Sequence, residues 1–204
     1  MNLDIGNVNR ASTQIERCWW CGEDPLYVSY HDTEWGVPLH DDRALFEMLI
    51  LEGFQAGLSW ITILRKRENF RKAFAGFDPD KVARFTERDV KRLLSDEGIV
   101  RNQAKVRAAV SNAQAFLRIQ EEVGSFDRYI WKFTDYKTLR NPFGVRQNTI
   151  PATSPESDAL SKDLKQRGFK FVGSTVCYAH MQATGMVDDH VEGCFRYIPC
   201  ANDF

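Results

Sequence analysis

The sequence lacks both a long apolar run and an excess of charge of one sign. Hydrophobic residues make up 43% of its 204 positions, yet no apolar stretch approaches the roughly 20 residues that a membrane helix needs, so no membrane span is expected. The 27 basic and 28 acidic residues leave a formal net charge of −1 and therefore no general attraction to nucleic acid. This composition is typical of a globular protein.

The start of the chain also lacks the apolar core of a secretory signal. The polar segment "MNLDIGNVNRASTQIER" predicts a disordered extension over residues 1–15 and a protein that stays in the cytoplasm. Cysteines are few and odd in number: Cys18, Cys21, Cys177, Cys194 and Cys200. An odd set fits a reducing compartment, with free thiols or thiolate ligands, better than a disulfide framework.

Strand-like alternation is scarce, whereas helix start and stop signals recur along the chain, so the predicted fold class is all-α. Helices are expected over residues 43–52 after a cap at Asp41 or Asp42, 60–74 after Ser59, 78–85 with the cap pair Asp78 and Pro79, 86–98, 102–120 and 154–168. An apolar stripe on the helix over 102–120 comprises Val106, Val110, Ala113 and Leu117. Residues 140–155 predict a long loop between two helical groups, and no internal repeat is present.

The segment "RGFKFVGSTVCYAHMQATG" (residues 167–185) predicts a helix-hairpin-helix. Gly168 and Gly173 allow a tight turn, anchored inward by Phe169 and by either Phe171 or Val172. The next helix would begin at Ser174 and Thr175 with unpaired backbone N–H groups, which can bind a DNA phosphate near Lys165, Arg167 and Lys170. Two helices joined by a glycine turn are common, so the same pattern also fits a purely structural pair.

The segment "DDHVEGC" places His190 and Cys194 four residues apart, which is metal-ligand spacing. Further ligand types occur near the start of the chain, at Cys18, Cys21 and His31. Cys18 and His31 with His190 and Cys194 would form a closed site for a structural zinc that joins the two ends of the chain. A competing set uses Cys21, in a C-x-x-C pair with Cys18, and leaves His31 as a core histidine. Unrelated buried cysteines and histidines are a third interpretation.

Aromatic and acidic residues gather in "PLYVSYHDTEWG" and "LEGFQAGLSW", where Tyr27, Tyr30, Trp35, Glu52 and Trp60 occur. Glu52 follows the apolar run "LFEMLIL" and precedes two glycines, so it is a candidate for a carboxylate that faces a cavity. A carboxylate in such a place requires a hydrogen-bond donor or a cation. The alternative is a solvent-facing Glu52 with the aromatic residues in the core.

Three longer segments are similar to a known family. "YHDTEWGVP", "FEMLILEGFQAGLSWITILRKRENFRKAF" and "DALSKDLKQRGFKFVGSTVCYAHMQATGMVDDH" resemble the 3-methyladenine DNA glycosylase I family of bacterial base-excision repair, over about Glu16 to Tyr197. The resemblance implies a helix-hairpin-helix glycosylase fold with a structural zinc held by Cys18, His31, His190 and Cys194. Cys21, Cys200 and the first 15 residues lie outside the family pattern.

The resemblance also implies roles for single residues. Glu52 would be the catalytic carboxylate and, with Tyr30, would contact the base, while Trp60 would stack on it. Tyr27 and Trp35 are expected in the same substrate-binding site, and the DNA backbone would meet Gly168, Lys170, Gly173, Ser174 and Thr175. The implied reaction is the extrusion and hydrolytic excision of N3-methyladenine from alkylated double-stranded DNA, without lyase activity.

The remaining expectations concern organisation. Residues 16–200 are expected to form one glycosylase domain, with two helical subdomains around a cleft as an open alternative, followed by a tail over 201–204. We expect a monomer in the bacterial cytoplasm with no obligate protein partner. The functional alternative is a zinc-stapled helix-hairpin-helix module that binds DNA and catalyses nothing; such a module has no use for a buried carboxylate beside aromatic rings.

Overall fold

The computed structural model describes residues 15–141 and 145–199. The extension predicted over residues 1–15 lies outside this range except for Ile15, and the tail lies outside it entirely. The predicted all-α class is confirmed by the described part of the chain. Its α-helices are α1 (Pro25–Thr33), α2 (Asp42–Gln55), α3 (Trp60–Ala73), α4 (Pro79–Val82), α5 (Glu87–Ser95), α6 (Gln103–Val123), α7 (Phe126–Trp131), α8 (Pro155–Gln166) and α9 (Ser174–Ala183). Short 3-10 helices cover η1 (Trp19–Cys21), η2 (Ala75–Phe77) and η3 (Lys132–Thr134).

Three predicted helix starts carry the expected cap, and Asn102 caps a fourth helix for which no cap was predicted. The side chains of Asp41, Asp78, Asn102 and Ser154 each accept a hydrogen bond from a backbone N–H in the first turn of the helix that follows. Ser59 does occupy the N-cap position of α3, but its hydroxyl lies 2.8 Å from the hydroxyl of Thr62 and caps no backbone N–H. The predicted helix start at Ser59 is therefore confirmed, but the predicted hydrogen bond from the Ser59 side chain to the backbone of α3 is wrong.

Two other details of the prediction were wrong. Helix α5 ends at Ser95 rather than Gly98, because Asp96 has an extended backbone conformation and its carboxylate accepts the N–H of Gly98, two residues further on, at 2.8 Å. On α6, Val106 and Ala113 are fully buried, but Val110 and Leu117 are only partly buried. The buried face of α6 is displaced toward Ala109 and Phe116, which pack into the core.

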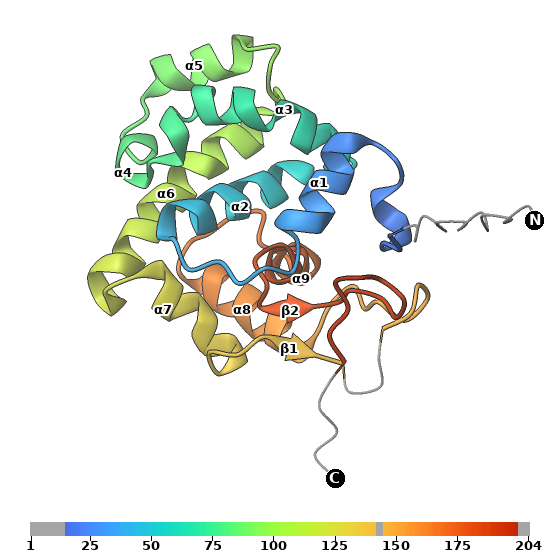
Figure 1. Ribbon diagram of the computed structural model, residues 1–204. Coiled ribbons are helices and arrows are strands. Elements are labelled where there is room, and N and C mark those ends of the chain that lie inside the picture. Colours follow the sequence, from blue (N-terminus) through green and yellow to red (C-terminus); the bar gives the residue numbers. More distant parts are fainter. Residues whose placement is uncertain (1–14, 142–144, 200–204) are drawn as a thin grey trace, which may run out of the picture.

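Helix α2 runs through the middle of the molecule. It contacts α3, α6, α7 and α9, and all residues from Leu45 to Phe54 are buried, so this helix is covered on all sides. Figure 1 shows α3, α4 and α5 on one side of α2 and α9, and α7, α8 and the two strands on the other. The C-terminal end of α2 therefore brings Glu52 into the interior, between the two helical groups.

The predicted loop over 140–155 is irregular in its described part, but it begins from a strand that the sequence did not indicate. Strand β1 (Leu139–Arg140) pairs in parallel with β2 (Val187–Asp188). The chain enters β2 after a sharp turn at Gly185, where φ is +70° and a Cβ would lie 2.4 Å from the backbone of Val37 and Pro38. Only glycine fits this approach, which brings residues 188–194 back against the start of the chain.

The described helices include none that is long and apolar enough to cross a membrane.

Candidate functional site

A pocket of about 400 Å³ opens between η1, α1, the end of α2, the start of α3 and α9. Its lining residues are Trp19, Trp20, Tyr27, Tyr30, Trp35, Glu52, Gln55, Trp60, Gln147, Ile150, Ala179 and Gln182. The wall is thus mainly aromatic, with one carboxylate and a few amide side chains. Pockets of this volume and character accommodate a flat organic ring system.

Glu52 is the only carboxylate among these lining residues, and it is buried. Its side chain is 4% exposed, and its Oε2 has no hydrogen-bond partner among the described residues. Burial raises the pKa of Glu52 to about 8. A buried carboxyl group without a protein partner is costly, so this one is suited to a ligand that brings a donor or a positive charge.

The aromatic side chains surround this carboxyl group. The rings of Tyr30 and Trp60 lie 5.4 Å apart between centroids, and within the described ranges the buried Nε1 of Trp60 has no hydrogen-bond partner either. Burial, together with the nearby Glu52, keeps the pKa of Tyr30 well above its usual range, and burial raises the pKa of Tyr27 to about 12. Both tyrosines therefore keep their hydroxyl protons and can donate hydrogen bonds into the pocket.

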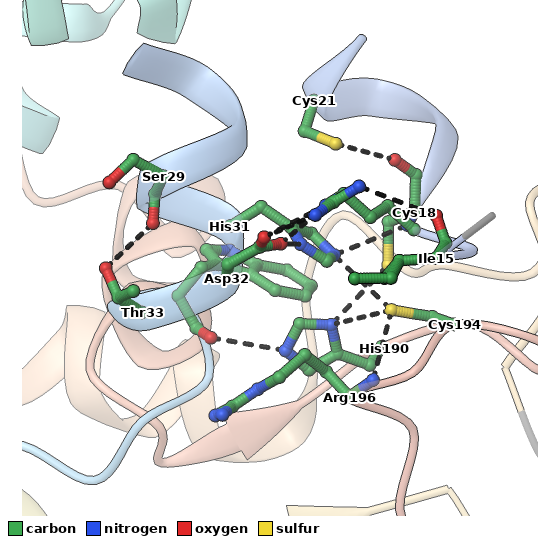
Figure 2. A network of polar contacts seen from close by, with 12 residues as sticks. Ile15, Cys18, Cys21, Ser29, His31, Asp32, Thr33, His190, Cys194 and Arg196 are labelled. Atoms are coloured by element: carbon green, nitrogen blue, oxygen red, sulfur yellow. Dashed lines mark hydrogen bonds and ion pairs between the residues drawn. The ribbon is translucent and has the colours of Figure 1, made fainter. Parts of the chain in front are cut away.

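A second cluster joins the two ends of the described chain. Figure 2 shows Cys18, His31, His190 and Cys194 with their ligand atoms turned toward one another. All four side chains are buried, and the four ligand atoms lie within 4.8 Å of one another. The Nδ1 of His190 is 3.5 Å from the Sγ of Cys18 and 3.7 Å from the Sγ of Cys194, which is 3.4 Å from the Nε2 of His31. This set can hold one four-coordinate metal ion.

The surroundings of the cluster fit a metal as well. The second ring nitrogen of His31 lies 2.7 Å from Asp32 Oδ1, and that of His190 lies 3.2 Å from the carbonyl oxygen of Trp35. Such partners fix the orientation of metal-bound imidazoles. Backbone N–H groups of Val191 and Arg196 also point at the sulfur atoms of Cys18 and Cys194, at 3.5 Å and 3.4 Å, where they can stabilise thiolates.

The pKa values of the candidate ligands also fit a metal site. Burial raises the pKa of Cys18 to about 12 and lowers the pKa of His190 to about 4. The imidazole is therefore already in its ligand form, whereas the thiol needs a cation to release its proton. Cys21 takes no part, since its Sγ lies 3.1 Å from the carbonyl oxygen of Cys18 and outside the cluster. The set in which Cys21 replaces His31 is thus wrong.

The hairpin between α8 and α9 has the expected turn. Gly168 has a φ of +92°, and Phe169 and Val172 are buried as its anchors, while Phe171 is 38% exposed. The side chain of Asn112 in α6 binds the turn through the backbone of Lys170. It accepts the N–H of Lys170 at 2.8 Å and donates to the carbonyl oxygen of the same residue at 2.9 Å. No side chain caps the start of α9, so its first N–H groups have no side-chain partner.

The cations near the hairpin are not equivalent. Arg167 forms ion pairs with Glu122 at 2.6 Å and with Asp163 at 2.7 Å. Lys165 and Lys170 are exposed and form no ion pair within the described ranges. A smaller cavity of about 220 Å³ is lined by Leu58 and Thr175 among others, and it shares Glu52, Gln55 and Ala179 with the large pocket. The first turn of α9 therefore lies beside a cavity that adjoins the pocket.

Comparison with known proteins decides the family. The methyladenine glycosylase family matches residues 20–197 of this chain. The chain belongs to this family. It is 51% identical over 183 residues to DNA-3-methyladenine glycosylase 1 of Escherichia coli (strain K12), which covers 90% of this chain and 97% of that protein.

Solved structures of methyladenine glycosylases have the same fold. A crystal structure of 3-methyladenine DNA glycosylase I is 51% identical, with a TM-score of 0.87 over 90% of this chain and 100% of that one. A tyrosine-to-phenylalanine variant of 3-methyladenine DNA glycosylase I in complex with 3-methyladenine is 39% identical, with a TM-score of 0.84 over 87% of this chain and 95% of that one. The predicted family is thereby confirmed.

Within this methyladenine glycosylase, the five residues expected in the substrate site lie together. Tyr27, Tyr30, Trp35, Glu52 and Trp60 all line the large pocket, so the solvent-facing alternative for Glu52 is excluded. The sequence reasoning missed the other lining residues. Trp19 and Trp20 lie in "CWWC", a motif that was interpreted only through its cysteines. The three glutamines, Gln55, Gln147 and Gln182, carried no signal, because glutamine is common on helices and loops.

Proposed function

We propose that this chain is a DNA-3-methyladenine glycosylase, which extrudes N3-methyladenine from alkylated double-stranded DNA and hydrolyses its glycosidic bond. The observation that carries the proposal is the buried, unpartnered carboxyl group of Glu52 within an aromatic pocket. Family membership and the 51% identity to the Escherichia coli glycosylase support it.

The chemistry of the substrate explains why such a pocket suffices. A base alkylated at N3 is cationic, and its bond to deoxyribose is already weakened. Water adds to the anomeric carbon and releases one proton to solvent, while the bond to N9 breaks and its electron pair neutralises the departing base. The protein has to extrude the nucleotide, stabilise the cationic base and admit water.

Trp60 and Glu52 divide the recognition of charge between them. Trp60 stacks on the base, where cation–π attraction favours the cation over neutral adenine by about 0.5–2 kcal/mol. Glu52 accepts a hydrogen bond from the exocyclic amine and offsets the charge, with Tyr30 as a further hydrogen-bond partner. The raised pKa of Glu52 means that the empty pocket avoids a buried bare charge, and a cationic base then favours the ionised form.

We further propose that the reaction proceeds without lyase activity. No lysine lines the pocket among the described residues, so a Schiff-base nucleophile has no candidate there. The buried Lys105 donates instead to the carbonyl oxygens of Phe54 and Ala56, at 2.9 Å and 2.6 Å.

DNA would bind across the start of α9, beside the cavity that adjoins the pocket. Backbone N–H groups at Gly173, Ser174 and Thr175 would meet a phosphate, with Gly168 allowing the turn and Lys170 adding charge. The uncapped start of α9 and the exposure of Lys170 support this placement. The hydroxyl of Ser174 lies 2.8 Å from that of Ser157, so Ser174 would act through its backbone.

Zinc is the metal that we propose for the four-residue cluster. Bonds of about 2.3 Å to sulfur and about 2.0–2.1 Å to nitrogen in a tetrahedron place unlike ligand atoms about 3.6 Å apart. The distances of 3.4 to 3.7 Å between sulfur and nitrogen atoms support this assignment. A closed set of two cysteines and two histidines leaves no open position, so the zinc would be structural.

Three organisational expectations also remain proposals: one glycosylase domain over residues 16–200, a monomer without an obligate protein partner, and a place in the bacterial cytoplasm. One buried cluster of side chains extends from Cys18 to Cys194, which supports a single domain.

The deciding experiment is a titration of the purified protein with free 3-methyladenine, followed by quenching of tryptophan fluorescence, beside an assay of base release from methylated duplex DNA. We expect saturable quenching and release of 3-methyladenine. DNA binding without either signal would favour the non-catalytic module.

A further inference from the structure

One amide side chain in the pocket wall, that of Gln182, is held in place by a hydrogen bond to a buried carboxylate. Gln182 lies on α9, and its Nε2 donates to the Oδ2 of Asp189 at 2.7 Å. Its backbone carbonyl accepts the N–H of Gly36 at 3.0 Å, which ties this part of α9 to the turn after Trp35. Gln55 and Gln147 also line the pocket, but neither side-chain amide has a partner among the described residues.

Asp189 is built to hold such an amide in one orientation. It is 3% exposed, and the same Oδ2 also accepts the hydroxyl of Tyr178 at 2.7 Å. A carboxylate only accepts hydrogen bonds, so the NH₂ group of the Gln182 amide must face Asp189. The flipped orientation, with the amide oxygen toward Asp189, is disfavoured. The Nε2 of Gln182 is thus engaged, and its Oε1 accepts no hydrogen bond from the described residues.

The substrate needs a second acceptor. The exocyclic amine of adenine carries two N–H groups, and a hydrogen bond to Glu52 satisfies one of them. A purine with a carbonyl oxygen at the same position, such as 3-methylguanine, would bring an acceptor toward an acceptor, and both groups would remain unsatisfied.

From this arrangement we infer that Gln182 is a specificity-determining residue for the exocyclic amine of the base, and that Asp189 is the positioning residue that fixes its amide. The role rests on the proposed function, because it concerns the same pocket. Tyr178 shares the acceptor with Gln182 but lines a different cavity, so it contributes no group to the base.

The test compares the affinities of the protein for free 3-methyladenine and free 3-methylguanine in wild type and variants. Asp189→Leu removes the shared acceptor while keeping the branching and the number of heavy atoms of the side chain, and it frees the amide to rotate, so the preference for 3-methyladenine should fall about tenfold, the worth of one hydrogen bond. Asp189→Asn keeps one oxygen that both donors can share, and it should restore the preference to within about twofold of wild type. Gln182→Leu should lower the preference as Asp189→Leu does.

Two controls separate this role from a structural one. Tyr178→Phe removes the other donor to Asp189 and should leave the preference unchanged. Since Asp189 precedes His190, metal content and the melting temperature are measured for every variant, and a folding defect would lower both affinities alike without changing their ratio. Gln182→Leu is distant from the metal ligands in sequence and keeps the test valid if Asp189→Leu does not fold.

The outcomes are distinct. Wild-type protein that binds neither base would contradict the proposed function itself. Wild-type protein that prefers 3-methyladenine, together with folded Asp189→Leu and Gln182→Leu proteins that keep the full preference, would overturn the roles of Gln182 and Asp189 alone.

Discussion

The indole ring of Trp20, in the pocket wall, lies 5.2 Å from the imidazole of His31, in the metal cluster, between ring centroids. A second contact of the same kind joins Trp35 to His190 at 4.7 Å, and the two tryptophans contact each other at 4.9 Å. The two histidines that can hold the metal therefore also support two of the rings that line the pocket. The cluster and the pocket are structurally connected, although none of the four cluster residues lines the pocket itself.

Loss of a metal ligand should consequently affect both folding and the pocket. Cys194→Ala or His190→Ala should abolish metal binding and lower the free energy of unfolding by about 4–5 kcal/mol, as loss of a cross-link over a loop of more than 100 residues would. Affinity for free 3-methyladenine should fall as well, because Trp20 and Trp35 lose their support. Metal analysis, thermal melting and fluorescence titration check these results. Cys21→Ser is the matched control and should retain its metal; a metal-free wild type with unchanged melting and activity would contradict the site.

Replacing Glu52 by glutamine should weaken base binding without unfolding the protein. Glu52→Gln keeps the volume and one acceptor oxygen but removes the charge, so binding of 3-methyladenine should weaken by about 1.5–3 kcal/mol, the worth of a hydrogen bond to a charged group. Release of the base from methylated DNA should slow but persist, because the alkylated bond is labile and stacking on Trp60 remains. Calorimetric titration and single-turnover release measure the two effects. Unchanged values in both would remove Glu52 from the site.

The same variant should change how stability depends on pH. The pKa of Glu52 is raised from 4.5 to about 8 in the folded protein, so the folded state holds a proton that the unfolded state loses. The contribution of the protonated group is complete below pH 4.5 and is lost as the pH rises to about 8. Glu52→Gln lacks this loss and should gain stability relative to wild type over that range, by on the order of a few kcal/mol. Denaturant unfolding of both proteins at several pH values tests this; parallel curves would mean that Glu52 ionises freely.

A negative charge at the start of α9 should impair DNA binding specifically. A Cβ on Gly173 meets no atom within 4 Å and φ is −63°, so a side chain fits there without strain. Gly173→Asp should lower affinity for duplex DNA about tenfold at low salt, and less at high salt, through repulsion of the phosphate. Gly173→Asn, equal in size and also a good N-cap residue, is the control and should bind DNA more tightly than the aspartate variant. An equal loss of DNA affinity in both variants would assign the hairpin a structural role. A loss of affinity for the free base in the aspartate variant would do the same.

Local signals in the sequence predicted many of the helices but not all of them. Helix α6 and helix α8 begin where Asn102 and Ser154 indicated. Helix α1 was missed although Asp24 and Pro25 form the same cap pair as Asp78 and Pro79, with Asp24 accepting the N–H of Leu26. Its nine residues mix aromatic and polar side chains without a single apolar face, so its position depends on packing that is not local.

Some residues of the candidate site could be predicted from the sequence, and others could not. Residue types and spacing identified the candidate residues but left Cys21 as an alternative ligand and a solvent-facing Glu52 as an alternative position, and the family resemblance favoured one choice in each case. The structure brings Cys18, His31, His190 and Cys194 together and places Glu52 in the pocket wall. The relation between Gln182 and Asp189 could not be read from the sequence. It depends on the reversal of the chain at Gly185, which places residues after α9 against the side chains of α9 itself.

The metal cluster also sets an order for synthesis on the ribosome. Cys18 and His190 are 172 residues apart, and a ribosome adds about 5–20 residues per second, so roughly 9–34 s separate the synthesis of these two residues. Until His190 and Cys194 have left the exit tunnel, Trp35 lacks its ring contact with His190 and the four-residue cluster is incomplete. A nascent chain can therefore form the contact between Trp20 and His31 early, but the support of Trp35 comes only after the segment that carries His190 has emerged.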